Sequence, residues 1–356
     1  MQHLFPYKWY LKDGYPAPGI DANGIDVFSC FACGGGSSMG YKLAGYNVIG
    51  CNEIDFKMAH CYAENHNPKY MFVQPIQEFV QRNTYPDELY NLGILDGSPP
   101  CSSFSMAGNR EDDWGKEKKF REGQSEQVLD TLFFDYIELA KKLQPKVVVA
   151  ENVKGLIMGE AKQYVRKIYD SFQKAGYELR IAPYLLNASQ MGVPQRRERV
   201  FFIALRKDLA VPFMEQVDMF QTAPKLDLQF NEPGILFGDV MNNVDVDDSR
   251  EITTHYKELW HQCEKGYSMS TVNEGNGFNN IKLDDKKICP TIASSNSIMM
   301  PNKPNYLGNN HFSLCGTYPV DYKYNGNKQY LIGMSVPPVM TAQIANQIYK
   351  QWLSKL

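Results

Sequence analysis

Long apolar runs are missing from the 356-residue sequence, and their absence argues against a membrane protein. No stretch approaches the roughly 20 consecutive apolar residues that a membrane-spanning helix needs. The first residues, MQHLFPYKWYLKDG, also lack the basic segment and apolar core of a secretory signal. We therefore expect a cytoplasmic protein that does not bind membranes.

The cysteines lack the spacing of a disulfide or zinc framework. Eight are scattered between positions 30 and 315, which fits a reducing compartment. Cys30 and Cys33 form one CxxC pair, but no second CxxC or CxxH supplies the remaining ligands of a zinc site. We expect no bound metal.

A strong charge of one sign is absent as well. The net charge is −3, so any nucleic-acid binding would depend on local positive patches. Residues 206–310 contain ten Lys and Arg against fifteen Asp and Glu, a net charge of −5, which leaves +2 for the rest of the chain. This segment is therefore a weak candidate for strong binding to DNA phosphates on its own.

What the sequence does contain is a regular alternation of short apolar runs and helical patterns over residues 25–205. This alternation predicts an α/β fold with a doubly wound, mostly parallel sheet. The predicted strands are 25–31, 46–53, 70–73, 91–96, 146–151, 178–186 and 199–205. The predicted helices are 38–44, 56–66, 125–142 and 160–175.

The alternation stops after residue 205, which indicates a second domain. Residues 206–329 are rich in Asn, Asp, Gly and Pro with short apolar runs, so we expect a smaller, irregular domain there. The final segment, 330–356, contains the helical pattern IANQIYKQWL and is expected to pack back on the 25–205 domain. Residues 1–24 are an N-terminal extension.

A glycine-rich turn follows the first predicted strand in FACGGGSSMG, residues 31–40. In a doubly wound sheet this turn lets the backbone approach a nucleotide-like ligand at a helix N-terminus. The second predicted strand reaches Glu53, whose carboxylate could accept hydrogen bonds from ribose hydroxyls. The alternatives are a tight turn without a ligand and a carboxylate that faces solvent.

Three further motifs lie at predicted strand ends. Cys101 follows a strand in DGSPPCSSFS, and Glu151 ends another in AENV. A thiol and a carboxylate at one sheet edge suit covalent catalysis with proton donation. In QRRER, residues 195–199, alternate residues should share one face. Taken singly, these could be a buried cysteine, a capping carboxylate and a surface basic run.

The order of these motifs, with GMSVPP at 333–338, resembles that of the DNA cytosine-C5 methyltransferases. The resemblance implies a Rossmann-like methyltransferase fold and a recognition domain in the variable region. It also implies S-adenosylmethionine as cofactor and a cytosine flipped out of double-stranded DNA as substrate. We further expect a monomer, and a cognate restriction endonuclease as the partner in a restriction–modification system.

The resemblance assigns roles to five residues. Cys101 would add to C6 of cytosine, which makes C5 nucleophilic toward the methyl group. Glu151 would hold or protonate N3, and Arg197 would contact O2 of the base. Asn152 and Arg199 would shape the site. The polar loop after Cys101, residues 106–123, resembles the catalytic loop that closes over DNA, although a merely solvated loop is the alternative.

Cofactor contacts carried over from the family come from five parts of the chain. The residues expected to bind S-adenosylmethionine are Phe31, Gly35, Gly36, Glu53, Ile54, Ile76, Asp96, Pro99, Ser335 and Val336.

Four positions depart from the family pattern. Cys33 replaces a glycine, Pro75 replaces an adenine-reading aspartate, and Met334 replaces an asparagine. The segment before Tyr318 lacks the usual arginine. Two alternatives therefore remain: a non-catalytic DNA-binding or regulatory homologue, and an RNA cytosine-C5 methyltransferase.

Overall fold

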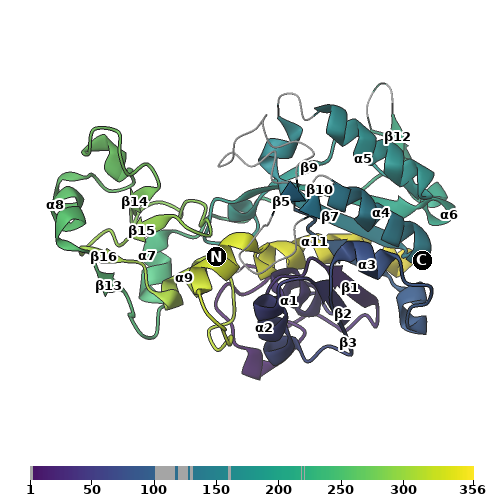
Figure 1. Ribbon diagram of the computed structural model, residues 1–356, viewed down its shortest axis with the longest axis horizontal. Helices are drawn as coiled ribbons and strands as arrows, with labels where there is room; N and C mark the ends of the chain where they lie inside the picture. The colour runs from purple at the N-terminus through teal and green to yellow at the C-terminus, as the bar shows by residue number, and fades with distance from the viewer. Residues whose placement is uncertain are drawn as a thin grey trace.

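The computed structural model describes residues 3–100, 131–158, 162–217, 219 and 221–356, with the short strands 117–118 and 127–128. Figure 1 shows a large α/β region on the right and a smaller lobe on the left. We call residues 250–306, which form most of this lobe, the distal region. The C-terminal helix α11 (Pro338–Gln351) belongs to the large region.

The large region is built on an eight-stranded sheet. Its strands are β1 (Asp26–Cys30), β2 (Asn47–Glu53), β3 (Tyr70–Val73), β4 (Ile94–Gly97), β7 (Val147–Val153), β8 (Tyr177–Glu178), β9 (Tyr184–Asn187) and β10 (Glu198–Arg206). The order is β3-β2-β1-β4-β7-β10-β8, and β9 also pairs with β10. Strands β1, β2, β3, β4 and β7 are parallel, whereas β10 is antiparallel to β7. The predicted doubly wound, mostly parallel α/β class is confirmed.

Both faces of this sheet are buried, and strand β7 shows how. Val147 and Val149 pack into one hydrophobic core, while Val148 and Ala150 pack into the other. Successive side chains of a strand point to opposite faces, so a run of apolar residues is what a doubly covered strand requires. Burial on both faces explains why apolar runs in the sequence predicted the strands.

Helices cover the two faces. The helices are α1 (Gly36–Leu43), α2 (Phe56–His66), α3 (Ile76–Val80), α4 (Leu132–Leu143), α5 (Lys162–Lys174) and α6 (Lys207–Ala210). Helix α11 packs against α1 on one side, and α4 packs against α3 and α5 on the other (Figure 1). Asp55 caps α2 by accepting from the backbone N–H of Lys57 and Met58. None of the described helices is long and apolar enough to cross a membrane.

Two segments differ from the sequence prediction. The predicted strand 178–186 is divided into β8 and β9, because the chain between them does not pair with β10. Residues 207–229, expected in the second domain, pack instead on the end of α11. The ring of Phe213 lies 6.5 Å from that of Trp352, and Trp352 Nε1 donates to Lys225 O at 2.8 Å. The hairpin of β11 (Met214–Gln216) and β12 (Thr222–Pro224) lies in this segment.

The distal region contains a small sheet of very short strands, in the order β13-β16-β15-β14. They are β13 (Arg250–Glu251), β14 (Asn280–Lys282), β15 (Ser297–Met299) and β16 (Asn305–Tyr306). Helix α8 (Thr254–Gln262) covers the sheet through a small core that includes Trp260 and Met299. Helices α7 (Phe237–Asn242), α9 (Asn309–Cys315) and α10 (Lys328–Met334) connect the two regions.

Candidate functional site

A row of polar side chains crosses one face of the large sheet near the carboxyl ends of its parallel strands. Ser29 on β1 pairs in register with Asp96 on β4, and Asp96 pairs with Val149 on β7. Glu151 lies two residues beyond Val149 and therefore on the same face. The start of β10 adds Arg199, because this strand runs in the opposite direction. A doubly wound sheet binds its ligands at this edge.

Asp96 is the buried acid at the centre of the row. Its carboxyl accepts from Ser29 Oγ at 2.7 Å and from Tyr41 Oη at 3.2 Å. Burial raises the pKa of Asp96 to about 7, and the two hydroxyl donors only partly offset this effect. Asp96 is therefore held in place behind the site and changes charge close to neutral pH.

Glu151 and Arg199 form a largely buried ion pair. Arg199 Nε lies 2.9 Å from Glu151 Oε1, and the two side chains retain only 14% and 12% of their exposure. Burial lowers the pKa of Arg199 from its ordinary value, and Glu151 opposes that shift. The carboxyl group is thus oriented by a planar donor, an arrangement that can present the second carboxyl oxygen to a ligand.

Asn152 connects this pair to the proline loop. Its Nδ2 donates to Pro99 O at 3.0 Å, and its Oδ1 accepts from the backbone of Val153 at 2.8 Å. The end of β7 therefore fixes the chain just before the predicted nucleophile. Cys101 lies outside the described residues. So does the predicted catalytic loop, residues 106–123, apart from 117–118.

The glycine-rich turn between β1 and α1 has an unusual backbone. Phe31, Cys33 and Gly35 have φ values of +52°, +48° and +89°, all in the left-handed region. Cys33 thus adopts a conformation that favours glycine, at the steric cost that a side chain carries there. Its N–H donates to Glu53 Oε2 at 2.7 Å, and Glu53 Oε1 accepts from Asp55 N at 2.8 Å.

A pocket lies between this turn, the end of β4 and the C-terminal loop. It is lined by Ser29, Phe31, Ala32, Cys33, Gly36, Ser37, Asp96, Ser98, Met334, Ser335 and Val336. Five predicted cofactor residues therefore meet here: Phe31, Gly36, Asp96, Ser335 and Val336. Tyr318 Oη donates to Ser335 Oγ at 2.7 Å, and Ser335 Oγ donates to Leu331 O at 2.7 Å.

The other predicted cofactor residues lie around the pocket rather than in its lining. Gly35 precedes α1, and Glu53 holds the turn through Cys33. Pro99 is placed by Asn152. Ile54 follows Glu53, and Ile76 is 3% exposed and packs into the core below α3. The role of Ile76 in binding the cofactor stays a prediction.

Several lining and supporting residues were missed by sequence reasoning. Ser29 and Ser98 line the pocket, while Tyr41 and Tyr318 support it. A usable signal existed for Ser29, because it is the polar residue inside the apolar run IDVFSCF. No comparable signal marks Tyr41 or Tyr318, whose partners lie far away in the chain.

Arg197 is placed differently from the expectation. Its side chain is 1% exposed, and its two terminal nitrogens donate to Ile292 O at 2.9 Å and Gly333 O at 2.7 Å. Burial lowers its pKa well below the ordinary value, with Arg199 adding to the shift. Arg199 pairs with Glu151, whereas Arg197 binds backbone carbonyls.

His66 supports the glycine-rich turn from behind. The imidazole stacks on Tyr62 with ring centroids 4.4 Å apart, and a Cβ on Gly35 would overlap Nε2. Neither ring nitrogen has a hydrogen-bond partner. Burial lowers the pKa of His66 well below its ordinary value, and the nearby Lys42 adds to this shift. Because a Cβ at position 35 would collide with this ring and φ there is +89°, the turn requires glycine.

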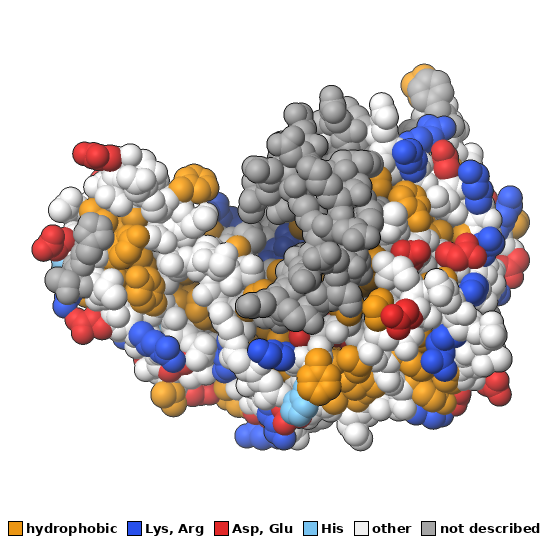
Figure 2. Space-filling model, in the orientation of Figure 1, with side chains coloured by type: hydrophobic (Ala, Val, Ile, Leu, Met, Phe, Trp, Pro, Cys, Tyr) orange, Lys and Arg blue, Asp and Glu red, His pale blue; other side chains and the backbone are white. Residues whose placement is uncertain are grey.

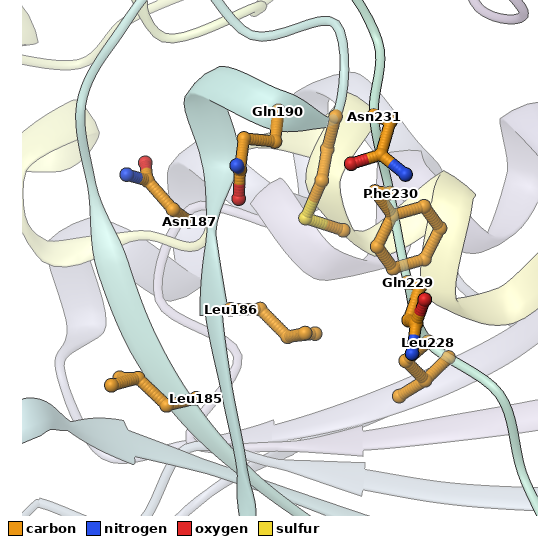
Figure 3. Close-up of a pocket in the computed structure, with 9 residues that line it drawn as sticks. Leu185, Leu186, Asn187, Gln190, Leu228, Gln229, Phe230 and Asn231 are labelled. Atoms are coloured by element: carbon orange, nitrogen blue, oxygen red, sulfur yellow. The ribbon is translucent and has the colours of Figure 1, made fainter.

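A second hollow of about 260 Å³ lies away from this pocket, between β9 and the extended segment 228–231. Figure 3 shows Leu186 and Phe230 toward its interior, with the amides of Asn187, Gln190 and Asn231 around it. None of its lining residues belongs to the predicted site.

The residues around the main pocket fit an adenosyl-type cofactor. A Cβ on Gly36 would overlap Val336 O and approach Tyr318 and Ser335, so only glycine lets the turn pack this closely against the C-terminal wall of the pocket. No described group of three His, Cys, Asp or Glu side chains is arranged to hold a metal ion. Fold and site thus define an α/β protein with a nucleotide-type pocket beside an acid–arginine pair.

The comparisons with known proteins identify the family. Residues 25–350 match the C-5 cytosine-specific DNA methylase family, and the chain belongs to it. The Type II methyltransferase M.FnuDI of Fusobacterium nucleatum is 35% identical over 194 residues, which are 54% of this chain and 50% of that protein. The orphan methyltransferase M.SPRI of Bacillus phage SPR is 35% identical over 165 residues, 46% of this chain and 34% of that protein. The alignments thus span half or less of these two relatives.

Solved structures show the same fold at lower identity. A prophage-encoded protein of E. coli has a TM-score of 0.65 at 18% identity, with 92% of this chain and 99% of that chain covered. The DNMT2 triple mutant of Spodoptera frugiperda has a TM-score of 0.59 at 16% identity, covering 92% of this chain and 100% of that chain. These similarities extend across both regions of the molecule.

Proposed function

We propose that the protein transfers a methyl group from S-adenosylmethionine to C5 of a cytosine flipped out of double-stranded DNA. The observation that carries the proposal is the Glu151–Arg199 pair, joined through Asn152 to the loop before Cys101. This pair lies at the same sheet edge as the pocket that we assign to the cofactor, and membership of the family supports that assignment.

In the proposed mechanism Cys101 forms a bond to C6 of cytosine, which makes C5 a carbon nucleophile. After C5 is methylated, a base removes the C5 proton and the bond between Cys101 and C6 breaks. S-Adenosylmethionine, when bound, supplies an electrophilic methyl carbon. Glu151 holds or protonates N3, which limits the negative charge that builds up on the ring.

The contact with the base that the sequence assigned to Arg197 is better supplied by Arg199. Arg199 Nε lies beside the Glu151 carboxyl group, whereas both terminal nitrogens of Arg197 are used by carbonyls. Arg199 Nη1 donates to Glu198 O at 2.8 Å, so Nη2 is the donor we assign to the base.

The cofactor would lie between the glycine-rich turn and the loop 334–336. Glu53 is the acceptor for the ribose, with its position already set by the N–H groups of Cys33 and Asp55. Phe31, Ser335 and Val336 line the pocket and would contact the ligand. Ile54 is the residue proposed beside the adenine ring.

Duplex DNA as the acceptor is supported by local positive charge. In Figure 2, Lys and Arg side chains are visible where the smaller lobe meets the large region. Positive charge at such a place attracts phosphates despite the overall charge of −3.

The test is incubation of the full chain with labelled S-adenosylmethionine and mixed-sequence duplex DNA, beside a matched pool of transfer RNA. Label on cytosine C5 of the duplex supports the proposal, and label on the transfer RNA alone would replace it with RNA methylation. Cofactor binding without label on either polymer would favour a non-catalytic homologue.

A second assay isolates the nucleophile. Duplex containing 5-fluorocytosine should form a covalent complex that depends on cofactor and disappears in Cys101→Ser, because fluorine at C5 blocks the final elimination. A complex that survives in Cys101→Ser would assign the nucleophile to another residue.

Three remaining assignments accompany this proposal. The relatives named Type II methyltransferases support a restriction–modification system with a cognate endonuclease as partner. All seven described cysteines are free, which supports the reducing cytoplasm as location. We propose a monomer, which sedimentation of the purified chain would test.

A further inference from the structure

The segment 195–197 binds backbone groups from three other parts of the chain. Gln195 is fully buried; its Nε2 donates to Cys315 O at 3.1 Å, and its Oε1 accepts from Ile292 N at 3.1 Å. Arg197 then donates to Ile292 O and to Gly333 O. Both polar side chains therefore hold the same residue, Ile292, through its N–H and its carbonyl.

The two carbonyls bound by Arg197 belong to different functional parts. Ile292 lies in the segment that leads to β15 of the distal region, residues 289–296, which we call the strap. A hydrogen bond from Arg196 N to Cys289 O, 2.8 Å long, also holds the strap. Gly333 lies in the last turn of α10, directly before the pocket residues Met334 and Ser335. One guanidinium thus joins the root of the distal region to the wall of the cofactor pocket.

The packing at this junction leaves little room for independent movement. A Cβ on Gly333 would overlap the backbone of Ala293 and Ser294, so the two segments touch through their main chains. One turn earlier on α10, Gln329 Nε2 donates to Ala293 O at 3.1 Å and to Asn296 Oδ1 at 3.0 Å. Since Arg197 is 1% exposed, water cannot replace its hydrogen bonds if one segment shifts alone.

We propose that Arg197 is a positioning residue that couples occupancy of the cofactor pocket to the placement of the distal region. The planar fork of arginine suits this role because it spans two carbonyls with fixed geometry, which a lysine ammonium cannot do. The proposal rests on the proposed function, in which the pocket takes the cofactor and the distal region reads DNA. Binding of the cofactor and binding of duplex DNA should then change each other's affinity by the same factor.

The direct test is amide hydrogen exchange of the full chain with and without S-adenosylhomocysteine. In the wild type, the ligand should slow exchange in 31–37 and 333–336 and also in the strap and strand 289–299, by about fivefold or more. Arg197→Met should keep the slowing in 31–37 and lose it in 289–299. Arg197→Lys, which retains a cation for one carbonyl, should give an intermediate loss and serves as the second variant if Arg197→Met does not fold.

The matched control is Arg196→Met, since Arg196 is the exposed neighbour and should leave both effects unchanged. Slowing in 31–37 without slowing in 289–299 in the wild type would overturn the coupling and leave the proposed function standing. Persistence of the distant slowing in both Arg197 variants would also overturn it. A wild type without slowing in 31–37 would refute the proposed cofactor site, and the coupling with it.

A second readout uses affinities. The dissociation constant of S-adenosylhomocysteine should fall by about fivefold or more when a mixed-sequence duplex pool is added, and this ratio should approach one in Arg197→Met. A uniform loss of stability would weaken binding with and without DNA equally. An unchanged ratio in Arg197→Met would contradict the proposal.

Discussion

The large sheet and the distal sheet of this molecule are held together in different ways. Strands of the large sheet reach nine residues, and side chains from both faces enter two extensive cores. Strands of the distal sheet have two or three residues; in β15, Met299 packs into one small core of the distal region, whereas its neighbour Ile298 joins the larger core. The distal region relies more on buried polar contacts: Lys282 Nζ donates to Trp260 O and Cys263 O, both at 2.9 Å, near the end of α8.

In the proposed function, this difference in packing separates the region of the chemistry from the region of DNA recognition. The rigid sheet positions the acid, the arginine and the pocket, where small displacements are costly for catalysis. The distal region has less apolar burial to define its shape, so its form depends on a few specific contacts. Changes in the two regions should therefore have different consequences.

The largest expected effect is on turnover. Glu151→Gln should lower the rate of methyl transfer by about 10²–10⁴-fold, because the residue can no longer donate or accept the proton at N3. Binding of S-adenosylhomocysteine and of duplex DNA should change little, which single-turnover assays and titrations would measure. Glu198→Gln is the matched control, since Glu198 pairs with Lys154 at the surface. Equal losses in both variants would show that the Glu151 effect is structural.

The next effect compares the two cores. Phe202→Ala in β10 should lower the free energy of unfolding by about 3–5 kcal/mol, and every probe of the fold should shift together. Met299→Ala in β15 is also fully buried but should act mainly on the distal region. Limited proteolysis should then cleave within 250–306 before the large region unfolds. A single shared transition in Met299→Ala would show that the two regions unfold as one unit.

A pH effect of smaller size should come from Asp96. Its pKa is about 7 in the folded protein, so the folded state keeps a proton that the unfolded state loses above its ordinary value of 3.8. Between pH 5 and pH 7 this group should therefore lower the free energy of unfolding by on the order of 3 kcal/mol as pH rises. In Asp96→Asn that loss should be missing, so the difference between variant and wild type should grow with pH and level off above pH 7.

Only a comparison of Asp96→Asn with the wild type isolates the contribution of Asp96 to the pH dependence of stability. His66 acts in the opposite direction, because its pKa is lowered in the folded state and its contribution is lost as pH falls below about 6.5. Chemical denaturation at several pH values would measure both. A difference between Asp96→Asn and wild type that is independent of pH would contradict the assigned pKa shift.

The smallest effect concerns Lys282. Lys282→Met should cost about 1–3 kcal/mol in the distal region, because the carbonyls of Trp260 and Cys263 would lose their buried donor. Methyl transfer at saturating DNA should stay close to that of the wild type, while DNA affinity falls. Lys265→Met, which removes a half-exposed ion pair with Asp285, is the control and should cost under about 1 kcal/mol. A loss of turnover at saturation in Lys282→Met would tie this region to the chemistry itself.

The sequence was most informative where both periodicity and motif agreed. The apolar runs of β1, β4 and β7 were readable because each strand is buried on two faces, and their polar ends then indicated the site edge. The pairing of β13 with β16 joins Arg250 to Tyr306, and strands of two residues leave no periodic signal. The split of 178–186 depends on which residues β10 pairs with, and this is a tertiary property.

The site shows the same limit. Glu151 and Asn152 lie at a strand end that local pattern predicts, and their partners Arg199 and Pro99 follow from the sheet order. The partners of Arg197 are carbonyls from positions 292 and 333, which only the folded chain brings together. Every residue has a backbone carbonyl, so the sequence does not indicate which carbonyls accept the hydrogen bonds of Arg197.

Strand β10 runs antiparallel to β7, so the spacing within QRRER decides which side chains lie on the same face as Glu151. Arg199 and Phe201 lie on that face, whereas Val200 and Phe202 point into the opposite core. One residue inserted between Arg197 and Arg199, with Arg199 and the rest of β10 kept in register, would shift Arg197 by one position and move its guanidinium away from Ile292 O and Gly333 O. The junction to the distal region and the arginine of the proposed reaction centre therefore keep their relative placement only while the spacing between these two residues stays the same.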